Sequence, residues 1–327
     1  MNTADNAQLR ATLGGTLQAV AATFFFATAA VLVRMVDGLP PTYIAAVRLG
    51  LAAGVMALFA IISRASLRIQ RRELGQLAMV GVIAAAHFTL YIQALNLTTI
   101  AHTLLLVNLS PVFVAVYGHL TGEHRLKPSQ YGGLLAAIGG VAVMVGFQAA
   151  ASPEILLGDA LALGSGLAYA VYSLMGRGLR KEYSLPKYAF WVYLSAGALL
   201  LPLGLWRLVG VGAVGNLAGV VGTAAASFGV AITLTGDNLL PLVLLGLLPT
   251  AFGHTLYNAA LRRIQATYAN LIATQEVTGG IILGFLVLGE EPTVITVLGA
   301  ALALLGIYWV LRTESPRGRR RRPSAQA

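Results

Sequence analysis

The sequence predicts an all-α membrane protein with ten transmembrane helices, and three observations support this fold class. Apolar residues make up 57% of the 327 residues and charged residues only 10%, whereas a soluble domain carries about 25% charged residues. Long apolar stretches recur along the whole chain, and about 20 such residues cross the hydrocarbon of a bilayer as a helix. The third observation is a weak internal repeat that divides the chain into two halves.

The expected helices follow one another with mostly short connections. In the first half they lie at about 14–34, 42–62, 75–95, 99–120 and 129–147. In the second half they lie at about 158–176, 187–206, 240–261, 265–288 and 292–311. Residues 209–235 are also apolar, but a span there would place the Arg-rich tail outside the cell. We therefore expect a long outer loop at about 209–239.

The two halves share a pattern of residues although few positions are identical. Setting Leu90 on Leu256 aligns the two copies. The aligned pairs are Tyr91 with Tyr257, Ala94-Leu95 with Ala260-Leu261 and, one inserted residue later, Gly122-Glu123 with Gly289-Glu290. Because five spans per copy is an odd number, the second copy would cross the membrane upside down. Such inverted repeats are typical of secondary transporters, whose binding site lies near the midplane between the copies.

This repeated pattern resembles the EamA domain of the drug/metabolite transporter superfamily. Two copies would cover residues 14–148 and 158–312. The first copy carries the proline of the family at Pro111, whereas the second has Val277 there, preceded by Glu276. The resemblance implies that spans 1, 3 and 4 and their counterparts 6, 8 and 9 line a central cavity.

The basic residues predict how the chain is oriented, because they remain on the cytoplasmic side. With ten spans and both termini inside, every Lys and Arg except Arg34, Arg48 and Arg207 lies in a cytoplasmic segment. We expect a multi-pass protein of the cytoplasmic (inner) membrane with cytoplasmic N- and C-termini. A basic tail over 313–327 would lie against anionic lipid, and the net charge of +10 then does not indicate nucleic-acid binding.

Glu276 is the only carboxylate placed deep in an expected span. A charge in a span costs about 2.5–3.5 kcal/mol and usually marks a bundle interior or a pathway. Glu276 is either a protonated structural group between helices or a group that pairs with a base or a substrate cation. Because burial disfavours the charged form of a carboxyl, we expect Glu276 to carry a coupling proton. Asp159 and Glu290 are expected at the outer edge, in contact with water. Glu123 and Glu290 each lie at the end of a span, where we expect them to cap a helix or pair with interface bases.

Other polar side chains are expected within the spans. His87 and His254 lie at nearly equivalent repeat positions, and each makes either a structural interhelical hydrogen bond or part of a cavity wall. His102 lies near the outer end of span 4. Arg48, whose counterpart is Tyr193, either snorkels to the outer interface or attracts a carboxylate. The expected substrate-binding residues are Arg48, His87, Tyr91, Asn108, Tyr169, Tyr172, His254, Tyr257, Asn270, Gln275 and Glu276.

These features predict a secondary-active transporter that exports amino acids or related small metabolites by alternating access, with coupling to protons. Arg48 and the histidines would offer a cation and Glu276 an anion, while the tyrosines would contact an apolar part of the substrate. A multidrug exporter of lipophilic cations, held by Glu276, is the alternative. The expected partners are a small molecule and the lipid bilayer, but not nucleic acid, and the chain acts as a monomer or homodimer.

An intramembrane enzyme is the alternative of another class, and the sequence does not favour it. Gly164-Ser165-Gly166 is not a GxSxG elbow, and no HExxH motif is present. The formal GxGxxG at 210–215 lacks the strand and helix of a dinucleotide site. The chain has no cysteine. We therefore expect no catalytic activity, no cofactor and no metal site.

Overall fold

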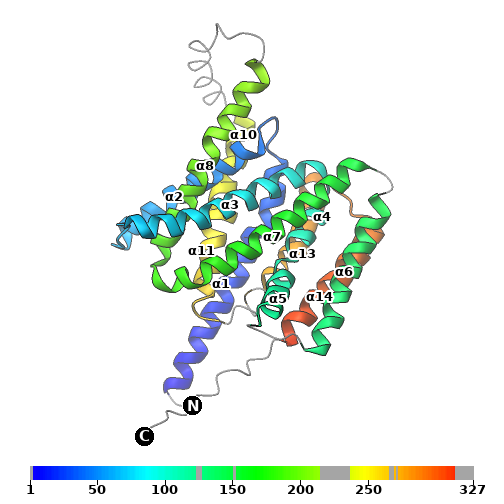
Figure 1. Cartoon of the computed structure of the whole chain (residues 1–327), viewed down its shortest axis with the longest axis horizontal. Helices are drawn as coiled ribbons and strands as arrows, with labels where there is room; N and C mark the ends of the chain where they lie inside the picture. The colour runs from blue at the N-terminus through cyan, green and yellow to red at the C-terminus, as the bar shows by residue number, and fades with distance from the viewer. Residues whose placement is uncertain are drawn as a thin grey trace.

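The computed structural model describes residues 3–122, 127–149, 152–213, 236–264, 269 and 272–313, and all regular structure in these ranges is helical (Figure 1). Eight segments are long and apolar enough to cross a membrane. The last two expected spans are represented by shorter apolar helices, Glu276–Leu288 and Val294–Val310. The protein is thus an all-α, multi-pass membrane protein.

The first half of the chain forms six helices. They are α1 (Thr3–Arg34), α2 (Pro41–Ile62), α3 (Arg71–Leu97), α4 (Ile100–Val107), α5 (Ser110–Leu120) and α6 (Pro128–Ala149). Pro41 begins α2 at the position where a helix tolerates proline, because its missing N–H would have no partner there. The α3 N-terminus is closed by Gln70 and Glu73, which cap each other's backbone.

The second half forms the remaining helices. They are α7 (Pro153–Glu182), α8 (Leu185–Ala213), α10 (Gly236–Leu245), the π-helix η2 (Gly246–His254), α11 (Thr255–Ala260), α13 (Glu276–Leu288) and α14 (Val294–Thr313). The expected outer loop at about 209–239 is therefore too long, because its first and last residues are helical. Residues 214–235, and with them most of that loop, lie outside the described residues.

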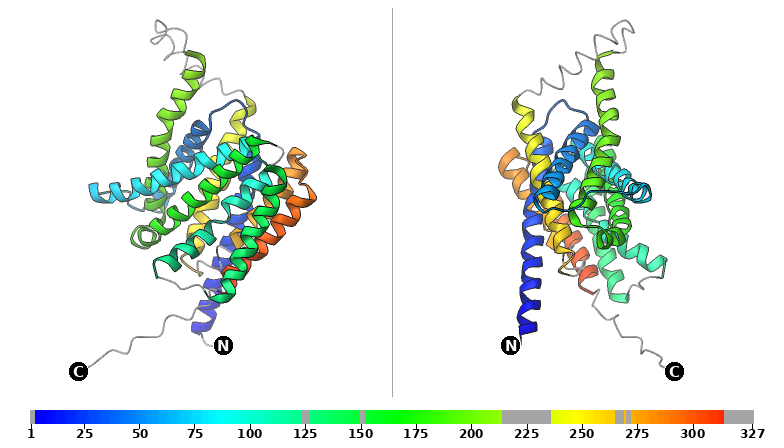
Figure 2. Two further views of the ribbon diagram at one scale, coloured as in Figure 1. Left: turned by 45° about the vertical axis from the view of Figure 1, so that its right-hand side comes forward. Right: turned by 90° about the vertical axis from the view of Figure 1, so that its left-hand side faces the viewer.

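Helices of the first half pack mainly on helices of the second half. The main pairs are α2 with α8, α3 with α7, and α6 with α14, while α1 packs on α13 and η2 (Figure 2). α6 and α14 approach most closely at glycines, where a Cβ on Gly140 or Gly306 would meet the backbone of the other helix. α1 begins and α14 ends towards the same end of the bundle.

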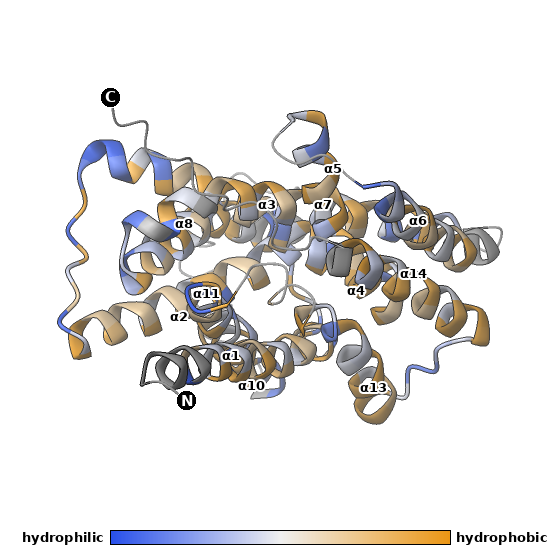
Figure 3. Ribbon diagram, turned by 90° about the horizontal axis from the view of Figure 1, so that it is seen from below, coloured by the Kyte–Doolittle hydropathy of each residue, from blue (hydrophilic) through white to orange (hydrophobic). Residues whose placement is uncertain are grey.

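The surface and the interior reverse the pattern of a soluble protein. Large apolar side chains are exposed around the bundle, among them Phe24 at 67%, Leu120 at 79% and Trp206 at 78%. Hydrophilic residues gather at the connections and helix ends (Figure 3). Several polar side chains, including Arg48 and His87, are buried instead. Such a surface suits hydrocarbon, and the buried polar groups need partners within the bundle.

Two expected spans are broken near their middle, which the sequence analysis did not predict. The span at 99–120 divides into α4 and α5 at residues 108–109, just before Pro111. In the span at 265–288, a turn at 274–275 precedes α13, while 265–268 and 270–271 lie outside the described residues. The repeat alignment places 108–109 on 274–275, so the two breaks are equivalent. Proline removes a helical hydrogen bond and accounts for the first break, but not for the second.

The span at 240–261 is also irregular. It consists of α10, η2 and α11 in continuous succession, and Pro249 lies inside η2. A π-helix is a rare conformation that occurs frequently at functional sites. Irregular backbone at membrane depth is tolerated only where it is buried in protein or lines a cavity. All three irregular segments contribute to one cavity.

Candidate functional site

A central cavity lies where the two halves meet. Its walls come from α1, α2, α3, α7, η2 and α11, together with both helix breaks. Polar and aromatic side chains from α2, α3, α7, η2, α11 and the two broken helices converge there. The expected site residues that line it are Arg48, His87, Tyr91, Asn108, Tyr169, His254, Tyr257 and Glu276.

Two expected site residues, Tyr172 and Gln275, lie elsewhere. Tyr172 lines a smaller neighbouring cavity, together with His87, Tyr169 and Tyr193. Gln275 is exposed, and its side-chain oxygen accepts a hydrogen bond from Thr278 at 3.4 Å. Asn270, like Glu123, lies outside the described residues.

Arg48 is buried, with 2% of its surface exposed, and does not snorkel to the interface. Its Nε donates to Thr250 Oγ1 at 2.9 Å, and its Cζ lies 4.4 Å from the centre of the Phe88 ring. These contacts join α2 to η2 and α3. A cation over an aromatic face is attracted by the ring quadrupole, more strongly when water is excluded. The partners that hold Arg48 inward come from distant parts of the chain, which explains why its orientation was left open by the sequence.

His87 has both of the roles that the sequence left open. Its Nδ1 lies 2.9 Å from Ser165 Oγ and 3.1 Å from the Ser165 carbonyl oxygen, and Ser165 Oγ donates to the His87 carbonyl oxygen at 3.0 Å. This interaction holds α3 to α7. The same ring lines the cavity and lies 5.0 Å from Tyr169.

His254 is held by aromatic rings. Its ring centre lies 4.8 Å from that of Phe26 and 5.6 Å from that of Phe88. It lines the same two cavities as His87. The repeat-related histidines thus meet at one site from α3 and η2.

Glu276 is the first residue of α13 instead of lying within a continuous helix. The N-terminus of a helix carries a partial positive charge, which stabilises a carboxylate. The side chain also interacts with Asn108 at the opposite break and, electrostatically, with Arg48. The two breaks therefore form part of one polar wall.

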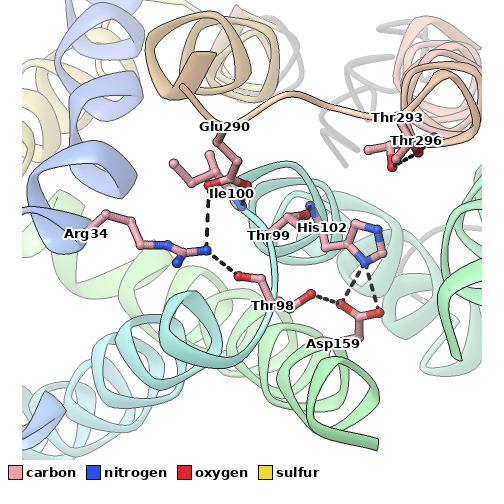
Figure 4. Close-up of polar contacts among 9 residues, drawn as sticks. All are labelled: Arg34, Thr98, Thr99, Ile100, His102, Asp159, Glu290, Thr293 and Thr296. Carbon is pink, nitrogen blue, oxygen red and sulfur yellow. Dashed lines mark hydrogen bonds and ion pairs between the residues drawn. The ribbon is translucent and has the colours of Figure 1, made fainter. Parts of the chain in front are cut away.

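A second polar group lies at the end of the bundle where α1 and α3 end and α7 begins (Figure 4). We call Arg34, Thr98, His102, Asp159 and Glu290 the end cluster. Asp159 accepts from Thr98 Oγ1 at 2.8 Å and lies 2.9 Å from His102 Nδ1. Glu290 lies 3.6 Å from Arg34 and accepts from the Ile100 N–H at 2.7 Å, which caps α4.

The end cluster corrects one expectation. The sequence predicts that Asp159 contacts water at the outer edge of the membrane. In the structure only 4% of its surface is exposed, and His102 beside it is fully buried. The sequence places both residues near span ends. It does not show that α4 and α7 pack together there and cover the pair. Glu290 does pair with a base, as expected.

The sequence analysis missed several residues of the site, among them Thr250 and Ser165. Thr250 holds Arg48, and Ser165 holds His87. Pro249 next to Thr250 was the available signal, because a proline in a span frees a backbone carbonyl. In the described ranges, no group of three or more His, Asp or Glu side chains could hold a metal ion.

Comparison with known proteins agrees with this architecture. The family described as the EamA-like transporter family matches residues 13–146 and 156–312. An uncharacterised transporter of Archaeoglobus fulgidus is 26% identical over 84% of this chain and 90% of its own length. Another from the same organism is 24% identical over 72% of this chain and 74% of its own.

A protein of known crystal structure has a similar fold. It superposes with a TM-score of 0.63 at 18% identity, and the match covers 90% of this chain and 96% of that protein. Both halves of the chain match the same family, and that family and the similar archaeal proteins indicate a transporter. The chain belongs to the EamA-like transporter family.

Proposed function

We propose that this protein is a secondary-active transporter that exports amino acids or related small zwitterionic metabolites across the cytoplasmic membrane. The observation that carries the proposal is the central cavity, which contains a buried Arg48 and a Glu276 on opposite elements. A zwitterion presents one positive and one negative group. Such a ligand complements both charges, whereas a singly charged ligand leaves one of them uncompensated.

The fold supports alternating access by ten helices arranged as two inverted repeats. The helix breaks at 108–109 and 274–275 occupy equivalent repeat positions and both border the cavity. In transporters with inverted repeats, discontinuous helices form the substrate site near the midplane, and one repeat rocks against the other. With both termini in the cytoplasm, the end cluster would lie at the outer end of the bundle.

Glu276 is the proposed coupling group. It lines the cavity at a helix N-terminus, where a carboxylate can exist, yet it is enclosed by apolar and aromatic walls. A carboxyl in such a place can exchange a proton for a substrate ammonium as its exposure to either side alternates. This exchange would link export to the proton gradient.

A multidrug exporter of lipophilic cations is the second candidate. The aromatic rings of Phe26, Phe88, Tyr169 and Tyr257 line the cavity, and Glu276 would supply the anion. Aromatic faces attract quaternary ammonium groups. The position of Arg48 argues against this alternative, because its guanidinium would repel a monovalent cation in the cavity.

Counterflow in proteoliposomes tests the proposed function. Vesicles containing the purified protein are loaded with each of the common amino acids in turn, or with a quaternary ammonium dye, and uptake of the labelled compound is measured. We expect counterflow of one or more amino acids, and Arg48→Met to abolish it. Counterflow of the dye alone would favour the multidrug exporter, and no counterflow of any compound would contradict both.

A further inference from the structure

We propose that Arg48 and Tyr91 form a subsite for a substrate carboxylate, and that Thr250 is the positioning residue of this subsite. The inference rests on the proposed transport function and deepens it. It begins from two buried polar atoms whose residues line the cavity. Arg48 Nη1 and the Tyr91 hydroxyl are buried, and neither has a hydrogen-bond partner among the described residues.

Such atoms are uncommon, because an unpaired buried donor destabilises a fold. The cost is greatest for a charged donor. Here a charged and a neutral donor from neighbouring helices, α2 and α3, are both left open beside one cavity. They are close enough to interact electrostatically. A ligand that supplies acceptor oxygens would satisfy both donors together.

Thr250 fixes the direction in which Arg48 offers its remaining donors. Its hydroxyl is fully buried, donates to the Leu245 carbonyl oxygen at 2.9 Å and accepts from Arg48 Nε at 2.9 Å. The bond to Leu245 spans five residues, the spacing of the π-helix in which Thr250 lies. Because the hydroxyl proton is directed to Leu245, the oxygen can accept from Arg48.

Phe88 lies against the guanidinium, with Cζ 4.4 Å from the ring centre. Nε is occupied by Thr250 and one face is covered by Phe88. The terminal nitrogens are therefore the donors that remain for a ligand. An arginine whose side chain is held in this way loses less entropy when it binds a carboxylate.

A carboxylate fits these donors better than other anions. Guanidinium is planar and matches two-oxygen acceptors, and the tyrosine hydroxyl adds a third donor. A phosphate dianion would be repelled by an ionised Glu276, which faces the same cavity. The repeat counterpart of Arg48 is the neutral Tyr193, so the second copy does not offer an equivalent cation. The cavity would thus bind one carboxylate, with the ammonium group towards Glu276.

Three compounds with the same aromatic body test the subsite. L-phenylalanine is a zwitterion, 3-phenylpropionate carries only the carboxylate, and L-phenylalaninamide carries only the ammonium. Their binding to the full-length protein in lipid nanodiscs is measured by calorimetry. We expect L-phenylalanine to bind more tightly than its amide by on the order of tenfold or more, because a hydrogen bond to a charged group is lost.

Variants of Thr250 and Tyr91 distinguish a role in carboxylate binding from a role in folding. Thr250→Val keeps the shape of the side chain but cannot accept from Arg48, and should weaken both acids by about tenfold while leaving the amide unchanged. Thr250→Ser retains the hydroxyl and should bind as the wild type does. Tyr91→Phe should weaken the acids in the same way. The control is Thr296→Val, which alters a buried threonine of α14 outside the cavity lining and should change none of the three affinities.

Several results would overturn the subsite. Binding of the amide as tightly as L-phenylalanine would contradict it. An equal weakening of all three compounds by Thr250→Val would indicate a purely structural role for Thr250. Failure of both acids to bind would also refute it. These outcomes leave the proposed function to be decided by the counterflow screen, which does not depend on aromatic compounds.

Discussion

The central cavity and the end cluster both contain buried charged groups, but they satisfy them differently. In the end cluster, Arg34 lies 3.6 Å from Glu290 and His102 lies 2.9 Å from Asp159. In the cavity, Arg48 and Glu276 face the same space, yet the ion pairs among the described residues do not join them. Arg48 also retains an unpaired nitrogen.

The difference separates groups that hold the fold from groups that await a ligand. Mutual pairing in the end cluster ties the end of α1, the start of α4, the first turns of α7 and the connection between α13 and α14 to one another. His102 Nε2 has no hydrogen-bond partner among the described residues, whereas the unpaired donors beside the cavity include a charged group, the Arg48 guanidinium. Removing a paired side chain of the end cluster should therefore reduce the stability of the fold. Removing an unpaired side chain of the cavity should reduce transport.

The largest expected effect concerns Glu276. Glu276→Gln keeps the shape of the protonated side chain but cannot release a proton. The wild type should concentrate its substrate about tenfold per unit of imposed pH gradient, for an exchange of one proton per substrate. The variant should reach only the external concentration while still showing counterflow. Accumulation by the variant under the same gradient would show that Glu276 is not the coupling group.

The next effect concerns the end cluster. Asp159→Ala leaves Thr98 Oγ1 and His102 Nδ1 buried without their partner, which should lower stability by about 3 kcal/mol. Thermal unfolding in detergent and membrane abundance measure the loss. The protein that remains folded should keep the KM of the wild type. The control is Glu291→Gln, because Glu291 is exposed next to Glu290; a raised KM for Asp159→Ala would place the cluster in the transport site.

The smallest expected effects distinguish the two histidines. His254 packs on aromatic rings, so His254→Ala should reduce counterflow with membrane abundance near that of the wild type. His87→Ala also removes the contact with Ser165, so it should lower stability by a further ~1 kcal/mol. Ser165→Ala should reproduce that loss of stability alone. If His254→Ala lost abundance and His87→Ala did not, the assigned roles would be reversed.

Much of the fold could be predicted because hydrocarbon imposes simple rules on a sequence. Spans require apolar stretches of a minimum length, and Glu276 could be recognised as unusual within one of them. The pair of helix breaks could not be predicted. Pro111 follows the first break, but no proline accompanies the second, at Thr274 and Gln275. Their equivalence becomes visible only once the residues of both turns are known.

The location of a side chain could be predicted where its residue type allows only one environment. It could not be predicted where the location depends on residues that are distant in sequence. Arg48 at two turns from the interface can point either outward or inward, and Thr250 and Phe88, from two other elements, hold it inward. Asp159 lies near a span end, and the packing of α4 against α7 buries it. Gln275 is adjacent to Glu276 in sequence, but it lies in the turn before α13 and is exposed.

A structure of the protein with its best amino-acid substrate bound tests the central claim most directly. The account predicts that the ligand lies in the central cavity, with its carboxylate within hydrogen-bonding distance of Arg48 Nη1 and the Tyr91 hydroxyl and its ammonium group beside Glu276. A ligand in the smaller cavity beside Tyr172, or one whose carboxylate points away from Arg48, would contradict it.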